Sequence, residues 1–363
     1  MNRRARQRGM SLIELMIALT LGLLLLAGIY RIFLSTSRTV QTTTALGDRQ
    51  EAIRYVSARL AQDVRMAGFR GCLSDMGEVR NTLNPDPAAS GGSRTAFTHS
   101  DFRYRYERYA EGFDGGASAW SPSLPSGFFA TARAGTDVLT VRGPVDAEVF
   151  TIRDMATTTA ELNINPVTPM PLAAGDIAMV ADCGGAAIFQ VSASSIGAVA
   201  LPAGGTGSIG SIAHAAGSGA PGNWSADLDR AFGAGAQLYR MGAVSYFIAD
   251  SALGSGPSLW RAVDGDAREI AAGIENLQVL FGEDSDGDQV ADVYRRADQF
   301  ADTAAWRRVA AVRVALLFSG TRDRAGLADP RSFDLLGVTV GPFSDGRLRR
   351  VVTLTLALRN RLP

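Results

Sequence analysis

The sequence predicts an α+β fold in which one long N-terminal α-helix, membrane-spanning in its first half, packs against an antiparallel β-sheet domain. Three features carry this prediction. An apolar segment lies near the N-terminus, a helical pattern of apolar residues follows it, and short alternating segments separated by Gly, Pro, Asn and Asp fill the remainder. The chain has 363 residues, which is enough to bury a large core.

The N-terminal segment has the layout of a membrane anchor. Residues 1–9 contain four arginines and no acid, and residues 10–30 carry a single charge, that of Glu14. This is about the length that a bilayer-spanning helix needs, and the arginines before it orient the N-terminus towards the cytoplasm. The alternative is a secretory signal cut after the apolar segment, for which Ala27 and Gly28 offer a mediocre site.

Glu14 is the exception within this apolar segment. An ionised carboxylate inside the hydrocarbon costs about 2.5 to 3.5 kcal/mol and is rarely kept without a partner, so we expect a cationic partner. If the chain is cut between Gly9 and Met10, the new α-amine lies four residues before Glu14. A neighbouring copy shifted along a bundle could supply the same charge, and the pairing would then set the register between subunits.

The helical pattern continues beyond the apolar segment. Apolar residues spaced three, four and four apart occupy one helical face, namely Ile53, Val56, Leu60 and Val64. Because Gly68 and Gly71 follow, we expect the helix to end near residues 66–69 and to exceed fifty residues. The alternative is a separate short core helix.

Beyond residue 72 the pattern is typical of antiparallel strands and turns. Seven segments are candidate strands, namely 137–142, 176–181, 186–192, 237–249, 274–282, 309–318 and 349–358. Residues 197–222 are rich in Ala, Gly and Ser, and we expect part strand and part mobile loop there. A G-x-G-x-x-G match in this tract is assigned to chance because no helix follows it.

Composition excludes several classes of function. The 36 basic and 36 acidic side chains cancel, so that no overall charge favours nucleic acid. All basic residues are Arg, and without Lys the usual P-loop and Schiff-base chemistries lose their key group. Two His and two Cys are too few for most zinc sites, and no hydrolase or metalloprotease motif is present. We therefore predict no catalytic residue.

The N-terminus resembles a known targeting signal. Gly9-Met10-Ser11-Leu12-Ile13-Glu14, followed by an apolar helix, is similar to the class III signal of type IV prepilins and type II secretion pseudopilins. The resemblance implies cleavage after Gly9 by prepilin peptidase, methylation of the new N-terminal Met10, and a role for Glu14 in aligning the subunit in a growing filament.

A weaker resemblance covers the outer part of the chain. The segments 67–72, 181–183 and 274–279 and the closing strand through Arg361 are similar to PilW-like minor pilins. The implied organisation is a leader at residues 1–9, a transmembrane and assembly helix at 10–34, a periplasmic helical half at 35–71, and a β-rich domain at 72–363. Residues 84–135 and 197–235 are interpreted as insertions.

The PilW resemblance implies a role without catalysis. Such a protein primes assembly of a type IV pilus and lies at or near its tip, in the service of adhesion and twitching motility. The implied partners are prepilin peptidase, other minor pilins, the major pilin, the inner-membrane assembly platform and a tip adhesin of PilY type. Two alternatives stay open: a type II secretion minor pseudopilin of the J type, and a membrane-tethered periplasmic adhesin or enzyme.

Cys72 and Cys183 are the only thiols of the chain. An extracytoplasmic domain meets an oxidising compartment, where such a pair normally closes, and we therefore expect a disulfide. It would tether the end of the long helix to the sheet, and a loop of roughly 100 residues corresponds to about 4.7 kcal/mol in the chain-entropy estimate. The alternative is two unpaired buried thiols.

Acidic residues are dense between Glu283 and Asp292, and their repulsion is relieved most directly by a hard cation such as Ca²⁺. The expected ligands, which resemble a short dockerin-type calcium loop, are Asp284, Asp286, Asp288, the backbone carbonyl of Val290, and Asp292. Gln289 and Arg295 stand where an EF-hand needs Gly and Glu, so an EF-hand is not expected. The alternative is a solvated acidic hairpin.

Residues 102–109 alternate aromatic and charged side chains. Stacking rings with arginines could capture DNA, but a strand with its aromatic residues packed inwards explains the pattern better, and we do not expect nucleic-acid binding. His99 and His214 lie in polar or Gly-rich surroundings and are interpreted as surface residues.

Overall fold

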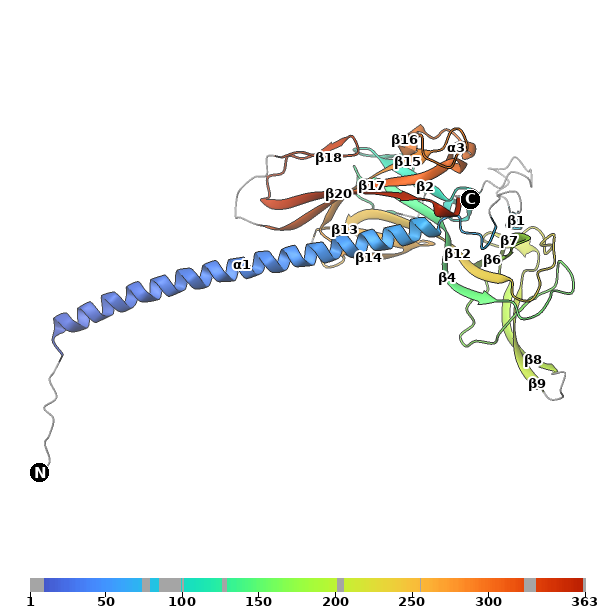
Figure 1. Ribbon diagram of the computed structural model, residues 1–363, viewed down its shortest axis with the longest axis horizontal. Coiled ribbons are helices and arrows are strands. Elements are labelled where there is room, and N and C mark those ends of the chain that lie inside the picture. Colours follow the sequence, from blue (N-terminus) through green and yellow to red (C-terminus); the bar gives the residue numbers. More distant parts are fainter. Residues whose placement is uncertain are drawn as a thin grey trace, which may run out of the picture.

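The computed structural model describes residues 10–73, 79–84, 99, 101–125, 129–200, 206–254, 256–322 and 331–361. One long helix projects from a β-rich head, and its C-terminal half lies along that head (Figure 1). The predicted α+β class, with a single N-terminal helix on a largely antiparallel β domain, is confirmed.

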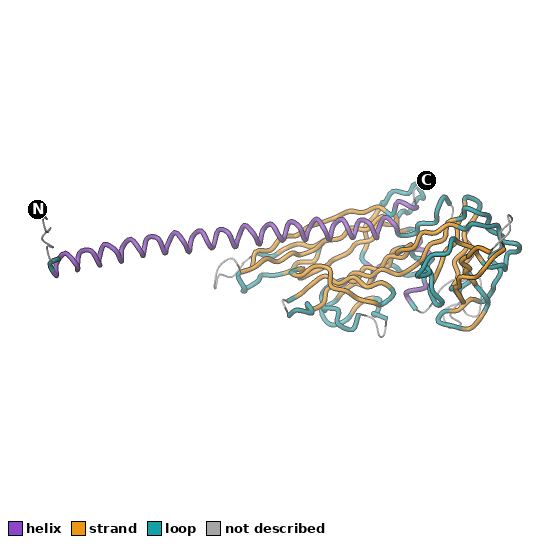
Figure 2. The backbone as a smooth tube through the Cα atoms, turned by 90° about the horizontal axis from the view of Figure 1, so that it is seen from below, coloured by secondary structure: helices purple, strands orange, loops and turns teal. Residues whose placement is uncertain are grey.

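The helix α1 spans Leu12–Met66 without interruption. Its 55 residues correspond to about 80 Å. It contains no proline, and it ends where the two glycines predicted, so the alternative of a separate core helix is wrong. Figure 2 shows that its second half runs along the strands of the head while its first half has no neighbour.

The largest sheet has nine strands and joins the two parts of the head. Its main order is β1-β7-β6-β12-β4-β2-β3, and β13 and β14 continue from the second half of β12. The strands are β1 (Val79–Asn81), β2 (Ala110–Gly115), β3 (Trp120–Ser121), β4 (Val138–Phe150), β6 (Ile177–Asp182), β7 (Gly185–Gln190), β12 (Gln237–Asp250), β13 (Pro257–Val263) and β14 (Asp266–Ala272). The first half of β12 lies between β4 and β6, and its second half between β4 and β13.

The remaining strands form one sheet beside α1 and several small ribbons. A four-stranded sheet has the order β16-β15-β17-β20, from β15 (Ile274–Glu283), β16 (Val293–Arg295), β17 (Val309–Arg322) and β20 (Arg347–Ala357). A three-stranded sheet joins β5 (Leu162–Ile164), β9 (Thr206–Ala213) and β8 (Ala193–Ala200). The two-stranded ribbons are β10 (Gly217–Ser218) with β11 (Gly222–Asn223), and β18 (Phe333–Leu335) with β19 (Val338–Val340).

Four short helices complete the described chain: η2 (Phe102–Tyr104), η3 (Ala297–Gln299), α3 (Thr303–Arg307) and η4 (Arg359–Arg361). All seven predicted strand segments are strands. The antiparallel pattern has one exception among the described pairs, because β1 runs parallel to β7.

The main core lies between α1 and the two large sheets. Val56, Leu60 and Val64 of α1 are 0% exposed and pack with Tyr246 and Phe281 among others. A second core fills the smaller part of the head, around the strands β5, β6, β7 and β9. The predicted apolar stripe of the helix therefore faces the core.

The end of α1 touches β4 at backbone level. The N–H of Gly68 donates to the carbonyl of Arg142 at 2.9 Å, and Gly68 has a φ of +69°. A Cβ on Gly68 would lie 2.8 Å from the ring of Tyr109, and one on Gly143 would lie 2.4 Å from the carbonyl oxygen of Met66. Both positions therefore require glycine.

Candidate functional site

The start of α1 carries a capping box built from two residues of the predicted signal. The backbone N–H of Glu14 donates to Ser11 Oγ at 3.2 Å, and the backbone N–H of Ser11 donates to Glu14 Oε2 at 3.3 Å. The two side chains thus satisfy N–H groups that the first helical turn leaves open. Within this chain the carboxylate of Glu14 serves as a helix cap. The amine that cleavage would create belongs to Met10, the residue directly before Ser11.

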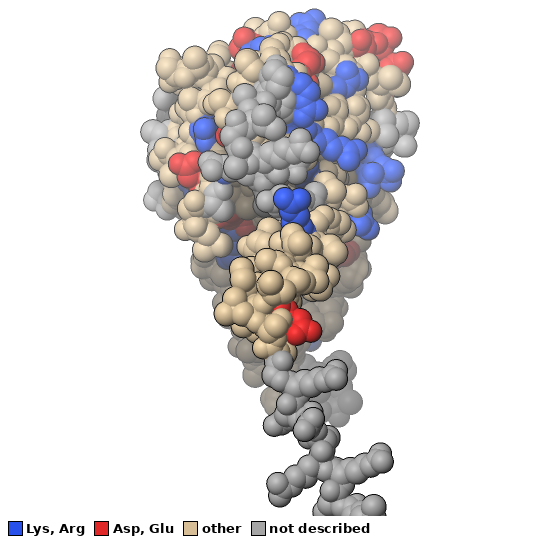
Figure 3. Space-filling model, turned by 90° about the vertical axis from the view of Figure 1, so that its left-hand side faces the viewer, with Lys and Arg blue, Asp and Glu red and all other residues tan. Residues whose placement is uncertain are grey.

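The first half of α1 is an uncovered apolar surface. The segment Leu12–Ser37 is long and apolar enough to cross a membrane, and none of it is buried inside the described chain. Leu12, Leu24 and Leu25 are 77%, 69% and 69% exposed. Figure 3 looks along this half towards the head and shows almost entirely uncharged residues in front of a charged surface. Such a continuous patch requires a membrane or another protein to cover it.

The second half of α1 is clamped to the head by polar contacts as well as by the core. Arg261 Nε of β13 donates to Asp63 Oδ2 at 2.7 Å, and the hydroxyl of Tyr246 donates to the same oxygen. Burial raises the pKa of Tyr246, and the Asp63 carboxylate adds to this rise. The side chain of Asn360 donates to the carbonyl of Arg65 at 2.6 Å, so that the end of the chain is tied to the end of the helix.

Cys72 and Cys183 form the predicted disulfide, with Cα atoms 5.0 Å apart and a sequence separation of 111. Cys72 follows the end of α1, and Cys183 lies in the turn between β6 and β7. The bond therefore tethers the end of the helix to the nine-stranded sheet, as predicted.

The acidic loop between β15 and β16 brings together three of its predicted ligands. Carboxylate oxygens of Asp284, Asp286 and Asp292 all lie within 4.8 Å of one another. Asp288, another of the predicted ligands, is not part of this group of side chains, and its Oδ1 accepts the N–H of Val290 at 2.8 Å.

Hydrogen bonds hold the carboxylates of this loop in place. Asp284 accepts the backbone N–H groups of Gly287 and Gln289 at 2.7 and 3.0 Å. Hydrogen bonds from the hydroxyl and the N–H of Ser285 lower the pKa of Asp292. The three clustered carboxylates are ionisable oxygen ligands of the kind that Ca²⁺ prefers.

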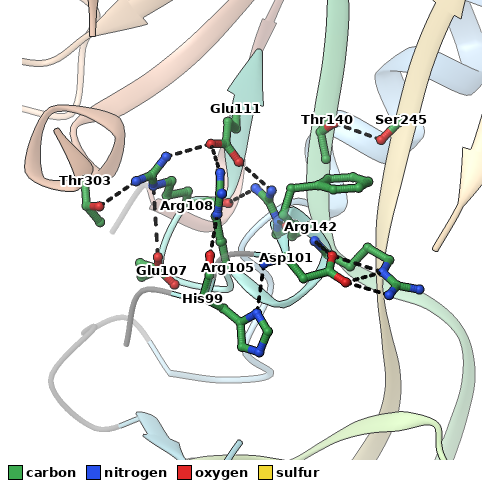
Figure 4. A network of polar contacts seen from close by, with 12 residues as sticks. His99, Asp101, Arg105, Glu107, Arg108, Glu111, Thr140, Arg142, Ser245 and Thr303 are labelled. Carbon is green, nitrogen blue, oxygen red and sulfur yellow. Dashed lines mark hydrogen bonds and ion pairs between the residues drawn. The ribbon is translucent and has the colours of Figure 1, made fainter. Parts of the chain in front are cut away.

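A buried ionic network that the sequence reasoning missed surrounds Glu111 of β2 (Figure 4). Glu111 Oε1 accepts from Arg105 Nη1 at 2.8 Å and from Arg108 Nη1 at 2.6 Å, and Oε2 accepts from Arg142 Nη2 at 2.6 Å. Burial raises the pKa of Glu111, but the three guanidinium groups outweigh this effect and hold it below its ordinary value. The network fixes the segment before β2 against β4.

The interpretation of residues 102–109 as a strand is wrong. Phe102–Tyr104 forms a short helix, and turns follow it. In this segment Arg103 contacts Asp101, and Arg105 and Arg108 contact Glu111; the alternation of residue types gave no sign of these ionic contacts.

The interpretation of His214 as a surface residue is also wrong. It is 2% exposed, its Nε2 lies 2.8 Å from the carbonyl oxygen of Ala160, and its ring packs against Phe189. His214 directly follows β9, and its side chain packs between residues from distant parts of the sequence, which the surrounding Gly-rich sequence did not indicate. His99 is partly buried, and its Nδ1 accepts the N–H of Asp101 at 3.0 Å.

Comparison with known families gives two matches at opposite ends of the chain. Residues 4–30 match the family model described as Prokaryotic N-terminal methylation motif, and residues 245–360 match the one described as Type IV Pilus-assembly protein W. The first includes the capping box and the start of the uncovered helix, and the second runs from the second half of β12 through β20 into η4. No curated protein and no solved structure matches the chain. The two matches, together with the long N-terminal helix and the β-sheets on which they lie, support the recognition of this chain as a PilW-like type IV pilus pilin.

Proposed function

We propose that this chain is a minor pilin that is anchored in the inner membrane, primes assembly of a type IV pilus and remains at or near its tip. The observation that carries the proposal is the division of α1 into two halves. The second half is built into the core of the head, while Leu12–Ser37 has no cover within the described chain. A helix divided in this way can pass from a membrane into a helical bundle without unfolding the head.

The shape of the head favours the tip over the body of a filament. The smaller part of the head, with β5 to β9, extends beyond the C-terminal end of α1 (Figure 1). A subunit in the body of a filament must accept further subunits above it, whereas a subunit at the tip has free space there. We propose that this part of the head faces outwards.

The proposed route begins in the membrane, with residues 10–34 in the bilayer, residues 35–71 outside it and the head in the periplasm. Prepilin peptidase removes residues 1–9 and Met10 is methylated. The mature chain then meets other minor pilins, the major pilin and the inner-membrane assembly platform, and presents a tip adhesin of PilY type. Its role in this sequence is packing, without catalysis.

Processing tests the first step of this route. Mass spectrometry of the mature chain is expected to show a methylated N-terminus at Met10, nine residues shorter than the precursor, in cells that contain prepilin peptidase. Gly9→Ala blocks the change, whereas Gly22→Ala, where an added Cβ meets nothing within 4 Å, leaves it intact. A mature chain that begins at any other residue contradicts the proposal.

Position in the filament is tested by deletion and labelling. Deleting the chain is expected to reduce the number of pili per cell, and an antibody to the head is expected to label filament ends. Labelling along the sides of filaments would exclude a tip position. Normal piliation with a loss of protein secretion would favour the type II secretion minor pseudopilin of the J type, and hydrolysis abolished by one point mutation would favour a tethered enzyme.

We also propose that the loop 284–292 binds Ca²⁺. The support is the convergence of Asp284, Asp286 and Asp292, whose mutual repulsion a divalent cation relieves. Asp288 and the carbonyl of Val290 complete the proposed ligand set.

A further inference from the structure

A cavity of about 390 Å³ lies at the junction between the end of α1 and the smaller part of the head. Residues that follow α1, the segment before β2, and the strands β1, β6, β7 and β12 form its walls. Phe69, Tyr109, Met179 and Met241 supply much of its apolar surface. This volume lies in the range of small-molecule pockets.

Two polar side chains in this cavity are buried without hydrogen bonds. Glu107 is 7% exposed and Tyr106 is 6% exposed, and both line the cavity. Neither carboxylate oxygen of Glu107, nor the hydroxyl of Tyr106, has a hydrogen-bond partner in the described chain. Arg108 Nε lies 4.0 Å from Oε1 of Glu107, close enough for an ion pair but too far for a hydrogen bond.

The hydrogen bonding of Glu107 differs from that of Glu111, whose carboxylate accepts from three guanidinium groups at 2.6 to 2.8 Å. Figure 4 shows Arg108 between the two acids, with Glu111 enclosed by the network and Glu107 at its edge. Burial raises the pKa of Glu107. The backbone N–H of Glu107 and the charges of Arg142 and Arg108 lower this pKa by less, so that it stays above its ordinary value. An unsatisfied buried polar group costs about 1 to 3 kcal/mol, and such groups in native structures call for an explanation.

The charges around the cavity restrict the class of ligand. Arg70, Arg142 and Arg307 line it, so a cationic ligand would be repelled. An anionic ligand would face the carboxylate of Glu107. A neutral ligand with several hydroxyl groups avoids both conflicts, because each hydroxyl can donate to a carboxylate and accept from a phenol. Its C–H faces can pack on the apolar and aromatic walls.

We propose that this cavity binds a neutral sugar residue, with Glu107 accepting hydrogen bonds from two of its hydroxyl groups and the hydroxyl of Tyr106 bonding to a third. This inference goes beyond the proposed role in assembly. It does not depend on the position of the chain in a filament, because all the residues that form the site belong to one head.

The test measures binding of D-glucose, D-galactose, D-mannose and N-acetyl-D-glucosamine to the full chain by saturation-transfer NMR and calorimetry. The chain is kept in a polyoxyethylene detergent, because alkyl glucosides and maltosides carry the probe chemistry themselves. At least one of the four sugars is expected to bind saturably. Absence of saturable binding for all four up to about 10 mM overturns the proposal.

Variants locate the binding. Glu107→Gln is expected to weaken the binding at least tenfold, and Tyr106→Phe, which keeps the ring, about threefold or more. The matched controls Glu161→Gln, at an exposed position, and Tyr294→Phe, on β16, leave it unchanged. Sugar binding that survives both cavity variants overturns the assignment to this cavity.

Two further probes distinguish the ligand class. Without sugar binding, n-butylammonium binding that Glu107→Gln abolishes, or inorganic phosphate binding that Glu107→Gln strengthens, would replace the sugar assignment by a charged ligand and so overturn it. If Glu107→Gln does not fold, Tyr106→Phe alone decides, because it removes only the hydroxyl and keeps the ring in the wall.

Discussion

Leu60 shows how much of the stability of the head depends on single residues of α1. It is 0% exposed in the main core, whereas Leu46 on the same helix is 44% exposed. Leu60→Ala removes buried methyl groups and leaves a cavity, and we expect it to lower the free energy of unfolding by about 2 to 5 kcal/mol. Leu46→Ala is the matched control and should change it by no more than about 0.5 kcal/mol.

Chemical denaturation in one detergent, with the disulfide intact, measures both variants. Equal effects of the two substitutions would mean that the second half of α1 is not part of the core. Such a result would remove the division of the helix on which the proposed function rests.

Asp137 provides a pH-dependent prediction at the same scale. Its Oδ1 and Oδ2 accept the N–H groups of Gly115 and Val279, each at 2.8 Å. Burial raises the pKa of Asp137 to about 7; the two N–H bonds oppose this rise and the Asp114 carboxylate adds to it. In the unfolded chain the pKa is about 3.9, so the folded state binds more protons between roughly pH 4 and pH 7. Stability therefore falls as pH rises through this window, by at most about 4 kcal/mol.

Denaturation at pH 5 and at pH 7 tests this prediction. We expect the parent chain to be more stable at pH 5, and Asp137→Asn to show a smaller difference between the two pH values, whatever its absolute stability. Asp266→Asn, at an exposed site, should keep the parental difference. An unchanged difference in Asp137→Asn would show that another group titrates.

The burial and hydrogen bonding of a side chain were hardest to predict where they depend on partners far away in the sequence. Glu107 and Glu111 are four positions apart in one charged segment, yet one is enclosed by three arginines and the other has no hydrogen bond in the described chain. Arg142, which is essential to this difference, lies 31 positions further along. The prediction that His214 is exposed was wrong for the same reason, because tertiary packing buries its side chain.

At the scale of elements, the loop between β15 and β16 carries the calcium prediction. We expect the full chain to take up about one Ca²⁺ at this loop in equilibrium dialysis, because three ionised carboxylates converge there. Asp286→Ala should remove this uptake. Asp266→Ala, on β14, is a control with the same change of charge.

Ca²⁺ that binds only the folded chain should also raise the thermal midpoint of the parent, and not that of Asp286→Ala. Asp288→Ala decides between the group of three carboxylates and the wider predicted ligand set: uptake is kept in the first case and weakened in the second. Equal uptake by Asp286→Ala and the parent would refute the site.

Long periodic elements were predictable, and short ones were not. The spacing of Ile53, Val56, Leu60 and Val64 located the buried face of α1, and Gly68 located its end, because each signal is local. The strands β1 and β3 have only three and two residues and depend on pairing with β7 and β2. Sequence patterns of that length are indistinguishable from loops.

At the scale of the whole molecule, the sequence predicted the helix on a β domain but not a head in two parts. The two parts are joined through β12, whose 14 residues pair with β4 and β6 at one end and with β4 and β13 at the other. A long apolar strand gives no sign that its neighbours change along its length. The uncovered half of α1, by contrast, follows directly from its composition.

Glu14 connects this uncovered half to assembly, and its two roles can be separated by mutation. As a cap it accepts the N–H of Ser11, and as a charge it would attract the α-amine of a neighbouring copy. Glu14→Gln keeps an amide oxygen for the cap and removes the charge. Ser11→Ala removes the Oγ that accepts the N–H of Glu14 and keeps the charge, at a cost of about 1 kcal/mol to the helix.

If the charge is what assembly requires, Glu14→Gln is cleaved and membrane-anchored normally but does not appear in sheared pili, and the number of pili falls to the level of the deletion. Ser11→Ala should be incorporated almost as well as the parent, because a weakened cap at one end of 55 residues leaves the remaining turns intact. Quantitative immunoblots of sheared filaments against cell membranes measure both variants. The reverse result, with Ser11→Ala excluded and Glu14→Gln incorporated, would assign Glu14 to helix capping alone and remove the electrostatic basis for subunit register.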